Sequence, residues 1–167
     1  MTARVHHSAI VVRDVEASLR FWRDGVGFEV TMDMHFDGDW SALFGAPANR
    51  LRSIFLGDPA RPDAGTVELV QFDEQSREAA AVSPAARPGF FLLSCYVDVD
   101  TVLDRLRVLD LGGQPRRIVV PGPGGETTAQ RPEGSGAWSR PVKGDVQMAT
   151  VVDPDGVLVE LIGAPTP

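Results

Sequence analysis

Apolar residues in the first half of the chain follow the two periodicities of strands and helices. Stretches rich in β-branched and aliphatic residues, or with polar–apolar alternation, predict four strands, at 4–12, 28–36, 51–58 and 65–73. Between the first two strands, apolar residues at helical spacing predict a helix over 14–28, with Asp14 as its N-cap. The first half is therefore expected to fold as β-α-β-β-β.

The same order of elements recurs in the second half of the chain. Apolar stretches predict four strands, at 90–99, 114–120, 145–153 and 156–163. Apolar residues at helical spacing predict one helix over 100–113, with Gly112 at its C-terminal end. The tight turn Asp-Pro-Asp-Gly at 153–156 joins the last two strands. An internal repeat of this kind predicts two tandem βαβββ modules of one design, in the α+β class.

The composition between the two halves indicates where the modules end. Residues 74–89 are charged and alanine-rich with two prolines, as in a linker, so the modules are expected to span 1–73 and 90–167. Within the second module, the segment 121–144 is far longer than an ordinary connection. It is expected to form either a flap over a pocket or a mobile surface excursion.

The composition also excludes several kinds of partner. The chain has 167 residues, of which 43% are hydrophobic, and a formal net charge of −7. Because phosphate backbones and anionic lipids attract basic surfaces, neither nucleic acid nor a membrane is an expected partner. The N-terminal stretch lacks the apolar core of a signal peptide, and no apolar run approaches the roughly 20 residues of a membrane span. The single cysteine, Cys95, excludes an intrachain disulfide, so a cytoplasmic location is expected. Because Cys95 lies in the apolar stretch FFLLSCYV, its thiol is expected to be buried.

Two glutamates occupy the same place in the two modules. Glu68 lies in GTVELVQF and Glu160 in GVLVELIG, each between apolar residues. Because side chains alternate along a strand, both are expected to point to the face opposite their apolar neighbours. Two carboxylates in one concave site would raise each other's pKa unless a cation lay between them, and a divalent ion with a neutral imidazole removes this penalty. The alternative is that each glutamate lies on a solvated sheet face.

With these features the sequence resembles the vicinal oxygen chelate superfamily, the glyoxalase, bleomycin-resistance and extradiol dioxygenase group. The matching stretches are HHSAIVVRDVEASLRFWRDGVGFEV, GTVELVQF, YVDVDTVLDRLRVLDLGG and VVDPDGVLVELIG. The resemblance implies paired βαβββ modules whose sheets curl around a shared cavity. It also implies a divalent metal (Ni, Zn, Mn, Fe or Mg) held by side chains from the first and last strand of each module. By position, His7, Glu68 and Glu160 match three of the four ligands. The remaining position falls near Leu92 or Phe91, and neither of these side chains binds metal.

The resemblance also implies an activity. A lyase or isomerase of the glyoxalase or epimerase type would act on a small oxygenated substrate through a metal-stabilised enediolate or enolate, with Glu160 and Glu68 as candidate bases that move the proton. The alternative is a small-molecule binding or resistance protein of the same fold without metal or other cofactor. An extradiol-type dioxygenase is less favoured, because its two histidines and one carboxylate would need the histidine that the second module lacks. Since modules of this superfamily often pair across a dimer, a homodimer is expected.

Several further side chains are candidates for substrate binding. Aromatic side chains that could form the walls of a pocket are Trp40, Phe44, Phe55, Tyr96 and Trp138, of which Phe55 and Tyr96 are expected instead in the core. Trp40 and Phe44 fall in the predicted loop DGDWSALFGAPANRL. Arg50 and Arg52 could pair with a carboxylate or phosphate of the ligand, or lie on the surface. His35 is expected to line the pocket or the surface and could replace the missing ligand, whereas His6 is expected to point away from His7.

Overall fold

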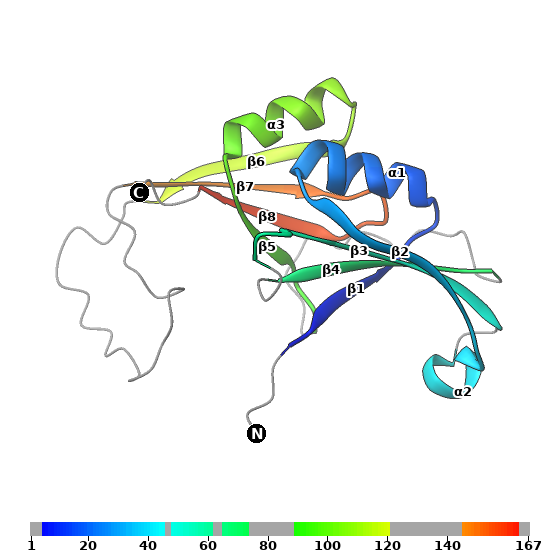
Figure 1. The fold of residues 1–167 in the computed structure, drawn as a ribbon. Coiled ribbons are helices and arrows are strands. Elements are labelled where there is room, and N and C mark those ends of the chain that lie inside the picture. The colour runs from blue at the N-terminus through cyan, green and yellow to red at the C-terminus, as the bar shows by residue number, and fades with distance from the viewer. Residues whose placement is uncertain (1–4, 46–47, 62–64, 74–88, 121–144, 164–167) are drawn as a thin grey trace, which may run out of the picture.

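The described part of the chain forms two four-stranded sheets (Figure 1). The computed structural model describes residues 5–45, 48–61, 65–73, 89–120 and 145–163. The first sheet has the order β1-β4-β3-β2, with β1 (His7–Val11), β2 (Glu29–Asp37), β3 (Arg50–Gly57) and β4 (Thr66–Phe72). The second has the order β5-β8-β7-β6, with β5 (Leu93–Val97), β6 (Gly112–Val120), β7 (Val146–Val152) and β8 (Leu158–Gly163). The predicted α+β fold of two tandem βαβββ modules is confirmed.

The pairing of strands is the same in both sheets. β1 runs parallel to β4 and β5 runs parallel to β8, while the other neighbours pair antiparallel. The first and last strand of each module therefore lie side by side. This adjacency brings residues that are far apart in the sequence, such as His7 and Glu68, onto neighbouring strands.

The first module has one main helix, and an aspartate fixes its start. α1 (Val15–Leu19) begins after Asp14, whose side chain accepts hydrogen bonds from two backbone N–H groups of the first turn. The helix continues directly into η1 (Arg20–Val26), a π-helical stretch. It ends at Gly27, whose φ of 101° is a conformation that glycine adopts without steric cost. The helix predicted over 14–28 is thus confirmed, with ends that differ by one or two residues.

The second module repeats this design, and one further short helix was not predicted. α3 (Val99–Val108) begins after Asp98, whose side chain accepts a hydrogen bond from the backbone N–H of Thr101. A second short helix, α2 (Trp40–Phe44), lies where the sequence predicts a loop. Asp39 caps it by accepting a hydrogen bond from the backbone N–H of Ala42, which stabilises the first turn of this short helix.

The two modules share one hydrophobic core. Its largest fully buried apolar side chains come from both modules: Trp22, Phe21, Ile54, Leu56, Leu69, Leu106 and Leu161. The helices of the two modules pack together, and α1 and α3 lie side by side in Figure 1. A Cβ atom added at Gly25 would lie 2.4 Å from Cδ2 of the buried Leu106. The absence of a side chain at Gly25 therefore allows η1 and α3 to approach each other closely.

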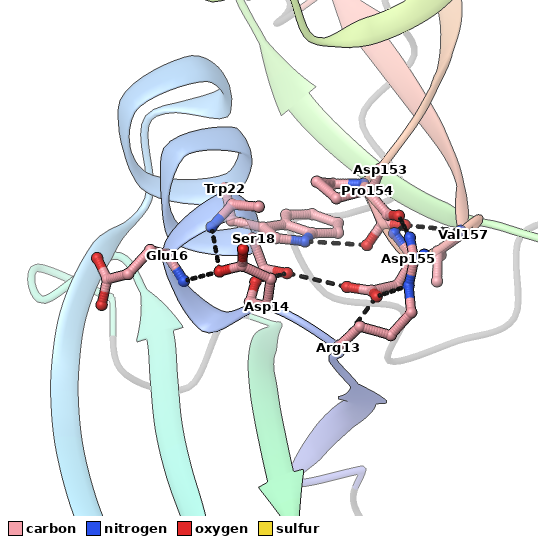
Figure 2. Close-up of polar contacts among 10 residues, drawn as sticks. Arg13, Asp14, Glu16, Ser18, Trp22, Asp153, Pro154, Asp155 and Val157 are labelled. Carbon is pink, nitrogen blue, oxygen red and sulfur yellow. Dashed lines mark hydrogen bonds and ion pairs between the residues drawn. The ribbon is translucent and has the colours of Figure 1, made fainter. Parts of the chain in front are cut away.

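The turn between β7 and β8 carries a buried aspartate that binds the first module (Figure 2). Asp153 is 4% exposed and accepts a hydrogen bond from the indole N–H of Trp22 at 3.3 Å. It also accepts hydrogen bonds from the backbone N–H groups of Asp155 and Val157, at 2.9 and 2.7 Å. Desolvation by burial raises the pKa of Asp153, although these donors oppose the shift.

Asp155, in the same turn, binds the beginning of the first module. Its Oδ1 accepts hydrogen bonds from the backbone N–H and from Nε of Arg13, at 3.0 and 3.1 Å, and its Oδ2 accepts one from the Ser18 hydroxyl at 2.9 Å (Figure 2). Arg13 also donates to the backbone carbonyl of Pro154. The predicted tight turn at 153–156 is therefore also a polar junction between the two modules.

Two expectations from composition concern Cys95 and membrane spans. Cys95 is buried in β5, and this burial raises the pKa of its thiol to about 11. The expectation of a buried thiol is confirmed. Among the residues that the structure describes, no helix is both long enough and apolar enough to cross a membrane.

Candidate active site

In the described part of the chain, one face of the first sheet packs into the core shared with the helices, and the other face carries Glu68. Val67 and Leu69, which flank Glu68 in β4, are 4% and 0% exposed in the shared core. Glu68 therefore points to the other face, as its apolar neighbours predict. Its direct neighbours there are Phe55 of β3 and Ala9 of β1. This face of the first sheet carries the candidate chemistry of the module.

His7 and Glu68 meet on that face. Nε2 of His7 lies 3.0 Å from Oε2 of Glu68, and the two side chains are 34% and 13% exposed. The other carboxylate oxygen, Oε1, accepts a hydrogen bond from the hydroxyl of Ser53 in β3, a residue that is only 2% exposed. The ring of Phe55 packs edge-on against the His7 ring, with centroids 5.2 Å apart. Both side chains are thus held in place by neighbours from adjacent strands.

Glu160 occupies the corresponding position in the second sheet. It lies in β8 directly opposite Ser94 of β5, whose hydroxyl donates a hydrogen bond to Oε2 of Glu160 at 2.6 Å. Each of the two glutamates therefore has one oxygen bound to a serine of a neighbouring strand. A hydrogen bond of this kind to a carboxylate limits the orientations that the side chain can adopt.

The strand register shows which residue of the second module is equivalent to His7. Ala9 pairs with Glu68, and Ser94 pairs with Glu160, so Ala9 and Ser94 are equivalent. Two residues before Ala9 is His7, and two residues before Ser94 is Leu92. Leu92 has no metal-binding atom, so the second module lacks the imidazole that the first module has.

One chain brings together two of the three predicted metal-binding residues. Among the described residues, no group of three or more His, Cys, Asp or Glu side chains is arranged to hold a metal ion. Glu160 consequently does not join His7 and Glu68 within the chain. A cleft of about 490 Å³ between β1 and the second module includes none of the three, as its lining residues are Ser8, Ala9, Ile10, Val11, Phe90, Leu93, Asp155 and Val157.

The geometry of the His7–Glu68 pair fits one side of a divalent metal site. Two ligand atoms that each lie about 2.1 Å from an ion, at right angles, are about 3.0 Å apart. Nε2 of His7 and Oε2 of Glu68 have this separation. One imidazole nitrogen and one carboxylate oxygen are ligands that Zn, Fe, Mn and Ni accept, but a stable site needs further ligands. The separation of the pair is thus compatible with two ligands of one ion, and it is also that of a hydrogen bond between the two side chains.

Apolar side chains surround this pair on the same face. Met34 of β2 pairs with Ser53, and Phe36 pairs with Leu51, so both methionine and phenylalanine side chains share the face of Glu68. Met34 is 49% and Phe36 is 37% exposed, and Val11 of β1 is 55% exposed. A sheet face with this much exposed apolar surface is typical of a ligand-binding or protein-binding surface.

The candidate aromatic residues of α2 lie at one end of this face. Trp40 stacks on Phe44, with ring centroids 5.9 Å apart and planes inclined by 14°. Phe44 contacts Phe72 edge-on, and Phe72 of β4 shares the face of Glu68. Phe44 remains 60% exposed. The two rings therefore lie beside the end of the face that carries Glu68.

The two candidate arginines and His35 lie on the opposite face. His35 pairs with Arg52 across β2 and β3, one residue out of step with the Met34–Ser53 pair, so its side chain points away from Glu68. Arg52 binds Asp33 through two hydrogen bonds of 2.9 and 2.7 Å, which lower the pKa of Asp33. Arg50 lies 3.7 Å from Asp37. Within one chain, none of the three side chains can assist His7 and Glu68.

Two further aromatic residues, Phe55 and Tyr96, lie elsewhere than expected, and a third, Trp138, is not described. Phe55 was expected in the core, but it is half-buried and packs on His7. Tyr96 was expected in the core as well, but it is 50% exposed. It lies two residues after Ser94 in β5, so strand alternation places it on the face of Glu160. Trp138 and the rest of the predicted flap, 121–144, lie outside the described residues.

Three polar residues beside the candidate site residues were not predicted from the sequence: Ser53 and His6 near the His7–Glu68 pair, and Ser94 near Glu160. Ser53 and Ser94 are single hydroxyl residues inside apolar strands, LRSIF and LLSCY, and that pattern is the signal that could have identified them. His6 was expected to point away, but its Nδ1 lies 2.7 Å from Nδ1 of His7. The expectation was wrong because β1 begins at His7, so the alternation of a strand does not extend to His6.

Comparison with known proteins supports the same fold and identifies the family. The model of the Glyoxalase/Bleomycin resistance protein/Dioxygenase superfamily matches residues 4–161. A relative from Aspergillus terreus (strain NIH 2624 / FGSC A1156), named lactoylglutathione lyase-like protein terB, is 31% identical over 166 residues, which cover 96% of this chain and 75% of the relative.

Solved structures with low sequence identity share the fold. A glyoxalase family protein from Bacillus cereus superposes with a TM-score of 0.64 at 16% identity, covering 98% of this chain and 95% of the other. The trypanothione-dependent glyoxalase I of Leishmania major superposes with a TM-score of 0.55 at 19% identity, covering 97% and 87%. From the match of the family model over nearly the whole length and the paired βαβββ modules, this chain belongs to the glyoxalase/bleomycin resistance protein/dioxygenase superfamily.

Proposed function

We propose that this protein is a metal-dependent lyase or isomerase of the glyoxalase type, acting on a small substrate with two neighbouring oxygen atoms. The observation that carries the proposal is the His7–Glu68 pair, whose Nε2 and Oε2 atoms lie 3.0 Å apart on an apolar sheet face. The similarity to the Aspergillus terreus relative, a lactoylglutathione lyase-like protein, supports the reaction class.

The residues of this chain would have the following roles in the reaction. His7 and Glu68 would bind the ion, which would supply a Lewis acid that polarises the substrate oxygens. Ser53 holds Oε1 of Glu68, so Oε2 stays directed at the position between Glu68 and His7. Glu160, held through Oε2 by Ser94, would be the base that moves a proton at the neighbouring carbon. The apolar side chains around the pair would exclude water from that position.

We further propose that the working form is a homodimer, in which the partner subunit's Glu160 completes the site of His7 and Glu68. Two observations support this proposal. Within one chain, Glu160 does not join His7 and Glu68. In addition, the face of the first sheet that carries Glu68 and the face of the second sheet that carries Glu160 both expose apolar side chains. Val11 and Met34 are 55% and 49% exposed on the first sheet, and Tyr96 and Ile118 are 50% and 60% exposed on the second. Two such faces would bury each other in a dimer.

The experiment that tests the metal-dependent activity combines metal content with proton exchange. The purified full chain would be loaded with zinc or nickel, and the bound metal counted, alongside His7→Ala, Glu68→Gln and the control His35→Ala. The proposal expects stoichiometric metal in the parent and the control, with strong loss in the other two variants. Exchange of the substrate C–H for solvent deuterium, followed by NMR with a hemithioacetal of methylglyoxal, should require both metal and Glu160. Absence of bound metal in the parent would contradict the proposal.

A second candidate function is a metal-free binding protein of the same fold. The observation that favours it is Leu92, which takes the position equivalent to His7 in the second module and contributes no ligand. The exposed apolar face with Trp40 and Phe44 at its end would then hold a flat ligand without chemistry. This candidate predicts ligand binding that is unchanged by removal of metal and by His7→Ala.

A further inference from the structure

His6 and His7 are joined ring to ring at the start of β1. Their Nδ1 atoms lie 2.7 Å apart, and the ring planes are inclined by 86° with centroids 5.0 Å apart. Phe55 contacts both rings edge-on, with centroids 6.0 Å from His6 and 5.2 Å from His7. The position of the His6 ring is therefore defined by two neighbours on the sheet face that carries Glu68.

The short distance between the two Nδ1 atoms restricts where the hydrogens are. A neutral imidazole has one N–H donor and one bare nitrogen acceptor. Two nitrogens 2.7 Å apart form a hydrogen bond only if one is protonated and the other is not. One of the two rings therefore carries its hydrogen on Nδ1, and the other presents a bare Nδ1 to it.

This restriction reaches Glu68 through the other nitrogen of His7. Nε2 of His7 lies 3.0 Å from Oε2 of Glu68. When Nε2 carries the hydrogen, His7 donates to the carboxylate, and its bare Nδ1 accepts from His6. When Nε2 must offer its lone pair to an ion, the hydrogen of His7 is on Nδ1, and His6 accepts it. An imidazole at position 6 can serve in both arrangements, because it can donate or accept at the same atom.

We propose that His6 is a positioning residue for His7: its ring shares one Nδ1 hydrogen with the His7 ring and thereby holds Nε2 of His7 toward the position between His7 and Glu68. The proposal rests on the proposed function of His7 as a metal-binding residue. His6 itself does not reach that position, because its Nδ1 contacts the side of the His7 ring that faces away from Glu68.

The hydrogen positions can be tested without metal. Long-range proton–nitrogen NMR spectra of the metal-free, nitrogen-15-labelled full chain, recorded at alkaline pH where imidazole is neutral, report the tautomer of each ring. The proposal expects the two rings in opposite tautomers, with one protonated Nδ1 between them. In His6→Leu the spectrum of His7 should change, and in the control His35→Ala it should not. Two rings that both carry the hydrogen on Nε2 would overturn the proposal.

The effect on metal binding is tested with zinc and a conservative variant. Loss of a hydrogen-bond partner behind a metal-binding histidine typically lowers metal affinity 10–100-fold. Titration calorimetry with zinc should show such a loss in His6→Leu, a smaller one in His6→Gln, whose amide can also donate or accept, and none in His35→Ala.

The outcomes separate this proposal from the proposed function. Equal zinc affinity in His6→Leu and the parent would overturn the role of His6. If the parent binds no zinc, the proposed function fails instead, and the NMR spectra of the metal-free chain still decide whether His6 and His7 share the hydrogen.

Discussion

Asp155→Ala should weaken the polar junction between the two modules. The carboxylate accepts three hydrogen bonds from the first module, two from Arg13 and one from the hydroxyl of Ser18, a residue with 0% exposure. Hydrogen bonds to a charged group contribute about 1.5–3 kcal/mol each when buried. Because the Arg13 side chain is 36% exposed, its share is screened by solvent and counts for less. We therefore expect a loss of about 3 kcal/mol in the free energy of unfolding.

Asp155→Asn is the matched variant, because it removes the negative charge and one acceptor oxygen but keeps the other acceptor oxygen. The amide oxygen can replace Oδ1 and still accept from Arg13, while the amide nitrogen replaces Oδ2 opposite Ser18. The Ser18 hydroxyl can then donate only to the backbone carbonyl of Asp14, 3.1 Å away, and accept from the amide. The expected loss is about 1 kcal/mol, since every buried polar atom keeps a partner.

Urea denaturation and thermal unfolding of the full chain measure both effects. For a chain of this size, a loss of about 3 kcal/mol should lower the melting temperature by about 6–12 °C, and the asparagine variant should lie closer to the parent. The denaturation slope should not change, because the folded state stays compact. An alanine variant within about 0.5 kcal/mol of the parent would refute the reasoning, as would equal losses for the two variants.

Three further predictions concern single side chains. Burial raises the pKa of Asp153, so between the ordinary Asp pKa and the raised value the folded chain binds more protons than the unfolded chain. The free energy of unfolding of the parent, relative to that of Asp153→Asn, should therefore fall as pH rises through that range. Urea denaturation at several pH values measures this difference, and a difference that does not depend on pH would contradict the prediction. Ser53→Ala removes the hydroxyl from Oε1 of Glu68 and should lower zinc affinity 10–100-fold by calorimetry, whereas an unchanged affinity would show that Glu68 needs no such support. The Cys95 thiol, buried and with a pKa of about 11, should resist a disulfide reagent at neutral pH in the folded chain and react after denaturation, and rapid reaction in the native state would contradict its burial.

The sequence predicted the order of the elements and the direction of the two glutamates, because both depend on local periodicity. Glu68 and Glu160 each stand between residues of the core, so strand alternation alone places them on the opposite face. The same alternation shows that Met34 and His35 point to opposite faces, but it does not show which face the helices cover. In the structure Met34 shares the face of Glu68, and His35 lies on the other face.

Other features could not be predicted, because they depend on contacts between distant parts of the chain. The bonds from Trp22 to Asp153 and from Ser18 to Asp155 fix the two modules against each other, and no periodicity reveals them. This arrangement leaves Glu160 apart from His7 in one chain, although the repeat suggested a shared site. The position of His6 depends on where β1 begins, a boundary that a run of apolar residues does not define.

The central claim is that His7 and Glu68 of one copy share a metal site with Glu160 of another, and a mixing experiment tests it most directly. His7→Ala and Glu160→Gln chains, each expected to bind metal poorly and to lack proton exchange, would be co-expressed with different tags. Random pairing makes half of the dimers mixed, and each mixed dimer has one site with all native residues, so about a quarter of the parent activity and metal content should return. Activity of the mixture no greater than that of the separate variants would contradict the account.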